Sequence, residues 1–186
     1  MGTVVIPLQE LGYRVHMIQA LLRPLRGGRD VACCIDTGMY HGGKAVAAHD
    51  GLASGSDYRD WRFWTSARDL LCQYFELWRP SQGGRCLLLH RAYLNVFWLN
   101  RQTHSTEELV CVHCDPGDAS QEPTCRYKRG PHLHVMKAEE PLPHCHFPLN
   151  LGQLDDILTS ADSLTGAMEM AVGVISDEVL SRFPQR

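Results

Sequence analysis

The chain has 186 residues, of which 44% are hydrophobic and 21% charged, and its formal net charge is −3. This composition is that of an average soluble globular protein of one domain, and the charge excludes an overall basic field that would attract nucleic acid. No apolar run approaches the ~20 residues that a membrane span needs, and residues 1–8 lack the pattern of a signal peptide, so we expect no membrane partner. The eight cysteines show no tight disulfide framework, which favours reduced thiols and a cytoplasmic location.

Apolar residues recur with helical spacing in two segments of the first half of the chain. Leu8 to Leu22 has apolar side chains three or four residues apart and is followed by Pro24, which predicts an amphipathic helix. Arg59 to Trp78 shows a similar stripe and contains three of the four tryptophans, so we predict a second, Trp-rich helix there. Between them, residues 31–35 and 45–48 are short apolar runs typical of strands.

From residue 85 onward the pattern changes to that of β-strands. Tyr93 to Leu99 is apolar on both faces, as in a covered strand, and Leu109 to His113 predicts the next strand of an antiparallel β-meander. Two helices are expected after the meander, over residues 151–159 and 164–183. The predicted fold class is therefore α+β, an antiparallel β-meander packed by an N-terminal helix, the Trp-rich middle helix and two C-terminal helices.

The chain is expected to form a single domain, residues 1–186, with one candidate sub-boundary. Residues 81–84 form a polar, glycine-rich stretch between the predicted middle helix and the β-meander. A sub-boundary here would make residues 1–84 an N-terminal elaboration on a histidine-rich core, residues 85–186.

Two His-x-His triplets are the most informative motif in the chain. They are His132-Leu133-His134 and His144-Cys145-His146. Residues two apart in a strand share a face, so each triplet directs two imidazoles the same way. The segment between the triplets suits a turn, and pairing about Glu139 would set His134 opposite His144 and His132 opposite His146. All four rings would then lie on one side of one hairpin.

Such a histidine cluster suits either a metal site or an acid–base site. Imidazole is the commonest ligand for zinc and related divalent metals, so His132, His134, His144 and His146 are candidate ligands of an open, catalytic-type site. In a metal-free site, His132 or His134 would act as general base or acid near neutral pH, and Asp115, which ends the neighbouring predicted strand, would orient one imidazole. The alternative is that the triplets are two exposed, histidine-rich strand ends.

Cys111 and Cys114 form a Cys-x-x-Cys pair, which is half of many structural zinc sites. Cys125 and Cys145 are available as third and fourth ligands, at irregular spacing. Because positions 111 and 114 face opposite sides of a strand, buried or free thiols are the alternative.

Arg126, Lys128 and Arg129 form a local basic run directly before His132. Cations beside a histidine cluster suit a polyanionic substrate such as RNA, whose phosphates they would hold. A solvated strand edge is the alternative explanation of this run.

Residues 91–160 resemble the TumE-like toxins of bacterial toxin–antitoxin pairs. The similarity is carried by an aromatic strand and a strand that ends in Asp, then a Lys/Arg-Gly-x-His-x-His segment, a Phe-containing strand and a short acidic helix. These are Tyr93–Leu99, Leu109–Asp115, Lys128–His134, the strand with Phe147, and residues 153–158.

This resemblance implies an enzyme that acts on RNA as a translation-blocking nuclease or modifier, with a cognate antitoxin as its partner. It also implies an active patch made of Asp115, Lys128, His132 and His134. Pro116 stands where the family usually has Asn, and the ~85 N-terminal residues have no counterpart in the family.

The sequence is consistent with three functions. The first is an RNA-directed nuclease or toxin-like enzyme of bacterial defence, acting through the His-x-His hairpin beside the basic run. The second is a hydrolase or binding protein that holds zinc or another divalent metal. The third is a non-enzymatic interaction module, formed by the Trp-rich segment and the β-meander and paired with another protein, such as one encoded in the same operon.

Overall fold

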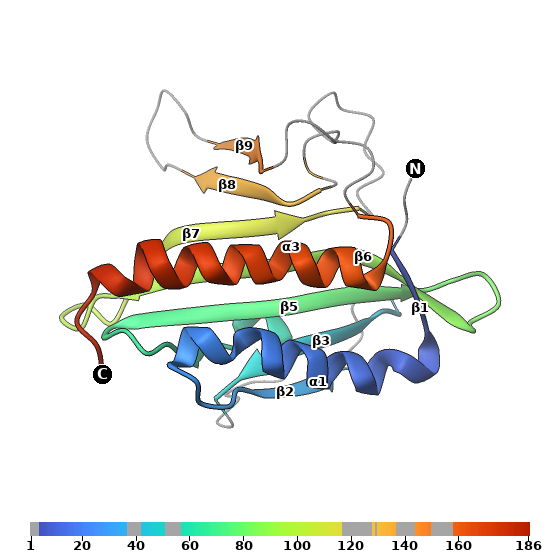
Figure 1. Cartoon of the computed structure of the whole chain (residues 1–186), viewed down its shortest axis with the longest axis horizontal. Coiled ribbons are helices and arrows are strands. Elements are labelled where there is room, and N and C mark those ends of the chain that lie inside the picture. The colour runs from blue at the N-terminus through green and yellow to red at the C-terminus, as the bar shows by residue number, and fades with distance from the viewer. Residues whose placement is uncertain are drawn as a thin grey trace.

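Antiparallel strands dominate the computed structural model, which describes residues 4–36, 42–50, 57–116, 128, 130–136, 144–149 and 158–186. The strands are β1 (Val5–Pro7), β2 (Ala32–Asp36), β3 (Lys44–His49), β4 (Phe63–Trp64), β5 (Leu70–Pro80), β6 (Cys86–Leu99), β7 (Thr106–Cys114), β8 (His132–Met136) and β9 (His144–Pro148). Across the described residues they form one nine-stranded sheet in the order β2-β3-β5-β6-β7-β8-β9, with β1 paired to β6 and β4 to β5 (Figure 1).

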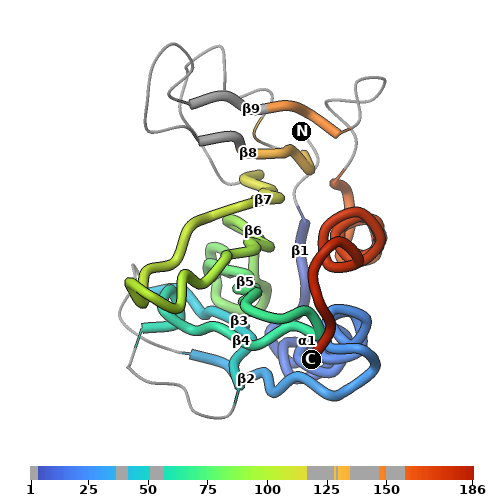
Figure 2. Tube along the Cα trace, turned by 90° about the vertical axis from the view of Figure 1, so that its left-hand side faces the viewer, coloured from blue at the N-terminus to red at the C-terminus, as the bar shows by residue number. Residues whose placement is uncertain are grey.

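Two α-helices, counted over the described ranges, cover one face of this sheet. They are α1 (Leu11–Leu22) and α3 (Ala161–Val174), and both lie on the same side of the strands (Figures 1 and 2). Shorter helical turns are η1 (Leu8–Glu10), η2 (Arg23–Arg26), η3 (Tyr58–Asp60), η4 (Ile175–Val179) and η5 (Leu180–Arg182). Among the helices of the described chain, none has the length and apolar character that crossing a membrane requires.

The helices begin and end where the sequence supplies caps. Ser160 and Ser163 form a reciprocal capping box at the start of α3. The turn that follows α1 ends at Gly27, whose φ of 63° lies in the left-handed region that glycine adopts at little cost. Within the helices, Ile18 of α1 and Met168 of α3 are fully buried and hold the apolar stripe of each helix against the sheet.

The hydrophobic core has two parts, one on each face of the sheet. The larger part lies between the sheet and the two helices, and it includes Trp78, Leu94 and Met168. The smaller part covers the opposite face near β3 and β5 and consists of Ala45, Ala47, Tyr58, Trp61, Phe75 and Leu77. The centre of the sheet is therefore buried on both faces.

The predicted middle helix is wrong, because residues 70–78 of that segment belong to the central strand β5 and residues 63–64 to β4. Tyr74 and Trp78 of this strand belong to the helix-side core, whereas Phe75 and Leu77 belong to the smaller cluster on the other face. A strand that is covered on both faces has a nearly continuous apolar sequence, which periodicity cannot distinguish from a buried helix. Asp69, with a φ of 64°, makes the tight turn immediately before the strand.

The predicted fold class is wrong for the same reason. The described chain is mostly antiparallel sheet with two α-helices, rather than an α+β domain with four helices. The N-terminal helix, the strands near residues 31–35 and 45–48, the strands of the meander and the last helix are confirmed. The helix predicted over 151–159 falls mainly on residues outside the described ranges.

The candidate sub-boundary at residues 81–84 is a hairpin turn. The backbone N–H of Ser81 donates to the carbonyl of Cys86 at 2.9 Å, and that of Gly84 donates to the carbonyl of Ser81 at 2.9 Å. This turn joins β5 to β6, which pair along their length, so the sheet is continuous across it.

A buried ionic cluster joins α1, β5 and α3 on the helix side of the sheet. Arg14 and Glu76 are 4% and 0% exposed, and Arg14 Nε donates to Glu76 Oε2 at 2.9 Å. Arg14 Nη1 donates to Thr165 Oγ1 at 2.5 Å, while Tyr74 Oη and Trp78 Nε1 donate to the Glu76 carboxylate at 2.6 and 3.1 Å. Burial alone would lower the pKa of Arg14, but the charge and hydrogen bonds of Glu76 outweigh it and raise that pKa above its ordinary value. Because the donors and acceptors of this cluster form hydrogen bonds with one another, the cluster links the two helices to the sheet.

Candidate metal centre

The face of the sheet opposite the helices carries two rows of polar and aromatic residues. Each row has one member on each of β6, β7 and β8. The rows are Tyr93–His113–His132 and Asn95–Cys111–His134. Side chains two apart in a strand share a face, so the two rows lie side by side. Asp115, two residues after His113, extends the same face just beyond the end of β7.

His113 is the centre of this cluster. Its ring stacks on Tyr93, with ring centroids 3.7 Å apart and planes 9° apart. The ring of His134 lies 4.7 Å from it, and the ring of His132 lies 5.8 Å away in an edge-on arrangement. Only 8% of His113 is exposed, so neighbouring side chains determine its chemistry.

A chain of amides fixes the tautomer of His113. Gln73 Nε2 donates to the backbone carbonyl of Arg59, and Asn95 Nδ2 donates to Gln73 Oε1 at 3.0 Å. Asn95 Oδ1 is therefore an acceptor, and it lies 3.1 Å from His113 Nε2. Because an amide oxygen only accepts, His113 Nε2 carries the proton, and in the neutral ring Nδ1 carries the lone pair.

A backbone carbonyl fixes the tautomer of His132 in the same way. His132 is fully buried, and its Nδ1 lies 2.9 Å from the carbonyl oxygen of Gly130. Nδ1 is therefore the donor, and in the neutral ring Nε2 carries the lone pair. His132 Nε2 lies 3.9 Å from Asp115 Oδ2, so the lone-pair side of this imidazole is next to a carboxylate.

His113, Asp115 and His132 each offer a ligand atom, and these atoms lie within 4.8 Å of one another. The side chain of Asp115 is 13% exposed, so all three groups are largely removed from water. Two imidazoles and one carboxylate are a ligand set of catalytic zinc sites and of non-haem iron sites. With tetrahedral metal–ligand distances of about 2.0–2.2 Å, the ligand atoms of a bound ion lie roughly 3.4 Å apart, so atoms separated by up to 4.8 Å must approach one another by up to about 1.4 Å.

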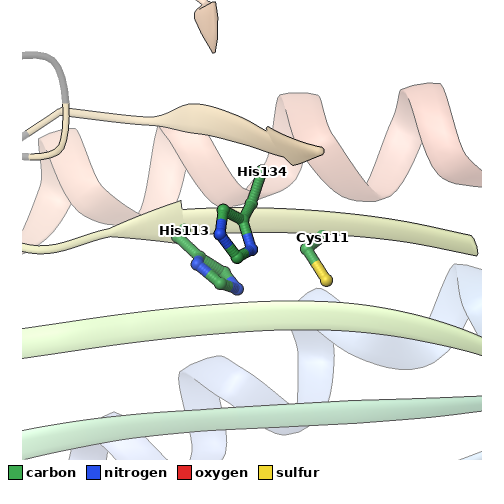
Figure 3. A group of neighbouring side chains, drawn as sticks. All are labelled: Cys111, His113 and His134. Carbon is green, nitrogen blue, oxygen red and sulfur yellow. The ribbon is translucent and has the colours of Figure 1, made fainter. Parts of the chain in front are cut away.

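Cys111, His113 and His134 form a second group of the same kind, also with ligand atoms within 4.8 Å. Figure 3 shows the His134 ring, which comes from β8, lying over the His113 ring, with Cys111 farther along β7. Burial raises the pKa of the Cys111 thiol, and the nearby Glu108 carboxylate raises it further. The two groups share His113, so this residue links the whole cluster.

The predicted register of the histidine hairpin is wrong by two residues. His134 pairs with His146 rather than His144, and His132 pairs with Pro148 rather than His146. In the observed register all five residues of β8 pair with β9, whereas the predicted register would have brought Pro131, which has no N–H, into the ladder. Pairing does keep His132, His134 and position 146 on neighbouring strands, and the side chains of residues 144–146 lie outside the described part of the structure.

The other predicted site residues are those of the basic run and the cysteines near it. The backbone N–H of Asp115 donates to the carbonyl of Lys128 at 2.8 Å, so Lys128 lies beside the end of β7 that carries Asp115. Arg126 and Arg129 lie outside the described residues. Cys114 belongs to the helix-side core, so it is not on the same face as Cys111, and burial raises its pKa. Cys125 is also outside the described ranges, and of Cys145 only the backbone pairing is described.

The prediction missed His113 and Asn95. Cys111, His113 and Asp115 alternate along one strand, and this spacing of two was a usable signal for His113. Asn95 had a weaker signal, as a lone amide in the otherwise apolar run from Tyr93 to Phe97. Its role depends on pairing with β7, which the sequence of one strand does not specify.

An apolar pocket of about 710 Å³ lies on the other face of the sheet, between β7, β8 and α3. Val112, Leu133, Met170 and Val174 are among its lining residues, and the lining includes no titratable side chain. Val112 and Leu133 alternate with the histidines along their strands, so the pocket is separated from the histidine rows by the sheet itself.

No family model matches the chain, and no curated protein or solved structure is significantly similar to it. The resemblance of residues 91–160 to the TumE-like toxins therefore stays a prediction. The function is inferred from the geometry of the site.

Proposed function

We propose that the protein is a metal-dependent hydrolase in which His113, Asp115 and His132 hold a divalent metal, either zinc or ferrous iron. The observation that carries this proposal is the pair of outer hydrogen bonds, in which Asn95 Oδ1 and the Gly130 carbonyl each accept an imidazole N–H. Metal-binding histidines are held in this way, because the outer acceptor fixes the tautomer and orients the other ring nitrogen for the ion.

The chemistry follows from the number of ligands. Three protein ligands would leave at least one coordination position for water, and a bound zinc ion would lower the pKa of that water to about 7. The ion would thereby supply a nucleophile for an ester phosphorus or carbonyl carbon, with an alcohol as the leaving group. His134, whose ring lies 4.7 Å from that of His113, would donate a proton to this leaving group.

For the substrate, we propose a phosphodiester of RNA, in a toxin-like role in the bacterial cytoplasm with an antitoxin as partner. The support is the hydrogen bond between the backbones of Asp115 and Lys128, which joins one residue of the basic run to the site. Cations at this position suit a phosphate backbone.

Metal analysis tests the proposal directly. The metal-free protein, reconstituted with Zn²⁺ or Co²⁺, is expected to bind one ion at the centre, and saturation at 100 times Kd should stabilise it by about 2.7 kcal/mol. His132→Ala and His113→Ala should each abolish stoichiometric binding and the visible Co²⁺ spectrum. Elemental analysis, competition with a chromophoric chelator and thermal unfolding measure these effects.

The matched control is His16→Ala, which removes an exposed imidazole from α1. This variant should bind metal as the wild type does. Failure of the wild type to bind any of Zn²⁺, Fe²⁺ or Co²⁺ would exclude the proposed centre, as would normal stoichiometry in both site variants.

An RNA cleavage assay separates the competing functions. A metal-dependent hydrolase loses activity with a chelator and regains it with metal, whereas a metal-free nuclease that uses His132 and Asp115 does not respond to the chelator. A non-enzymatic interaction module has no activity in either condition and keeps its partner when His132 and His134 are replaced.

A further inference from the structure

A β-bulge near the hairpin end of β6 places two consecutive side chains on the histidine face. Leu77 pairs with Arg91 and Trp78 pairs with Leu89, so His90 is an extra residue opposite β5. Leu89 and Ala92 both belong to the helix-side core, which leaves His90 and Arg91 directed to the other side. Bulges often re-aim side chains beside active sites.

The bulge brings two guanidinium groups onto one imidazole. Arg79 Nη2 lies 3.0 Å and Arg91 Nη2 lies 3.2 Å from His90 Nε2. Guanidinium N–H groups only donate, so His90 Nε2 is the acceptor and the imidazole is neutral in this arrangement. Two positive charges are therefore held close together by a neutral group.

Neither guanidinium forms an ion pair with a carboxylate among the described residues. In addition, Arg91 Nε is buried and has no hydrogen-bond partner within the described part of the chain. A buried, uncompensated guanidinium edge is costly by itself, and an oxyanion with two acceptor oxygens would satisfy it.

Arg91 lies next to the candidate metal centre. Arg91 Cζ lies 5.7 Å from the centroid of Tyr93, whose ring also stacks on that of His113. Tyr93 pairs with His113 and Ala92 with Cys114, so Arg91 occupies the next position of β6, in line with Asp115. An anion bound by Arg91 would thus lie in the same cross-strand row as Asp115 and one row away from His113.

We infer that Arg79, His90 and Arg91 form an anion subsite that binds a phosphate group of the substrate. This inference deepens the proposed function and rests on it for the role of the bound phosphate. Arg91 donates through its Nε and Nη groups, and Arg79 adds a second guanidinium from β5. A phosphate held here would leave an adjacent phosphodiester next to the residues that we propose as metal ligands.

Titration of the metal-free protein with inorganic phosphate tests the subsite without any metal. Arg91→Gln is expected to weaken phosphate binding at least about tenfold, and Arg79→Gln, at an exposed position, about three- to tenfold. Arg91→Lys keeps the positive charge but loses the planar set of guanidinium donors, so its affinity for phosphate should be intermediate. Isothermal titration calorimetry gives the affinities, and circular dichroism shows that each variant is folded.

Arg182→Gln is the matched control, because that exposed guanidinium pairs with Glu178 at 2.8 Å and lies outside the cluster. It should bind phosphate as the wild type does. Absence of phosphate binding by the wild type, or wild-type affinity in both Arg91→Gln and Arg79→Gln, overturns the subsite.

A second titration, with the Co²⁺-loaded protein, separates this inference from the proposed function. Enhanced ³¹P relaxation of bound phosphate would support a subsite next to the metal. If metal binds but Arg91→Gln leaves phosphate affinity unchanged, the anion subsite is refuted and the proposed function stands. If phosphate binds through Arg91 but no metal binds in the wild type, the proposed function fails and the anion site stands.

Discussion

The sheet buries polar groups on both faces, and the two sets differ in the partners of their hydrogen bonds. On the helix side, Arg14 and Glu76 have opposite charges and bond directly to each other. On the opposite face, the N–H groups of His113 and His132 go outward to neutral acceptors, and His132 Nε2 faces a carboxylate at 3.9 Å. In the first arrangement the charged groups satisfy each other, whereas the second brings together groups that we propose as metal ligands.

This difference shows that burial of a polar group does not by itself indicate function. A buried ion pair whose members satisfy each other marks a structural link, although it adds less stability than its short distances suggest. Imidazoles whose tautomers are fixed from outside are typical of metal ligands. The direction of the hydrogen bonds, rather than the depth of burial, assigns a different role to each face.

The largest expected effect comes from breaking the ionic cluster. Glu76→Gln should lower the free energy of unfolding by about 3–5 kcal/mol, because it leaves the buried guanidinium of Arg14 without a counter-charge. Metal stoichiometry of the folded fraction should not change, since the sheet separates this cluster from the histidines. Urea unfolding and metal analysis of the same preparation measure both quantities.

Glu178→Gln is the control, because its ion pair with Arg182 is exposed and should contribute less than about 1 kcal/mol. The double variant Arg14→Met with Glu76→Gln should recover part of the loss, since it removes the uncompensated charge. A stable Glu76→Gln protein, or one that loses metal while it remains folded, would contradict the separation of the two faces.

The same contrast explains which parts of the fold the sequence could predict. Amphipathic helices such as α1 and α3 carry a clear 3.6-residue stripe, and the strands of the β-meander are short apolar runs separated by turn residues, so these were predicted correctly. β5 was mistaken for a helix because it is covered on both faces and shows no alternation. Arg14 and Glu76 are 62 residues apart, and no local pattern connects them.

The candidate site was predicted in part for a similar reason. His132, His134 and Asp115 were found because they follow short-range spacing and strand ends. The register that joins them to His113 and Asn95 depends on pairing between separate strands, which a single sequence specifies poorly. The predicted hairpin register failed by two residues, and a shift of two keeps every side chain on its face.

The outer hydrogen bond to His113 provides a sharper test of the histidine face. Asn95→Ala removes the acceptor that fixes the ring, so metal affinity should fall about 10- to 100-fold while stoichiometry at saturation is kept. Competition with a chromophoric chelator measures the change. Asn100→Ala, which replaces a half-buried asparagine in the β6–β7 turn, is the control and should leave metal affinity unchanged. Wild-type affinity in Asn95→Ala would show that His113 does not need this partner to bind a metal.

The smallest expected effect concerns a thiol beside the ionic cluster. Burial raises the pKa of Cys33 from 9.0 to about 12, with further contributions from Cys34 and the Glu76 charge. Above pH 9 the unfolded chain loses this thiol proton while the folded protein keeps it, so the stabilising contribution declines as the pH rises from 9 towards 12. Between pH 8 and pH 10, the free energy of unfolding should therefore fall by about 1.4 kcal/mol less in Cys33→Ala than in the wild type. Urea unfolding of both proteins at the two pH values measures this difference, and parallel losses would show that the thiol does not sense the helix-side environment.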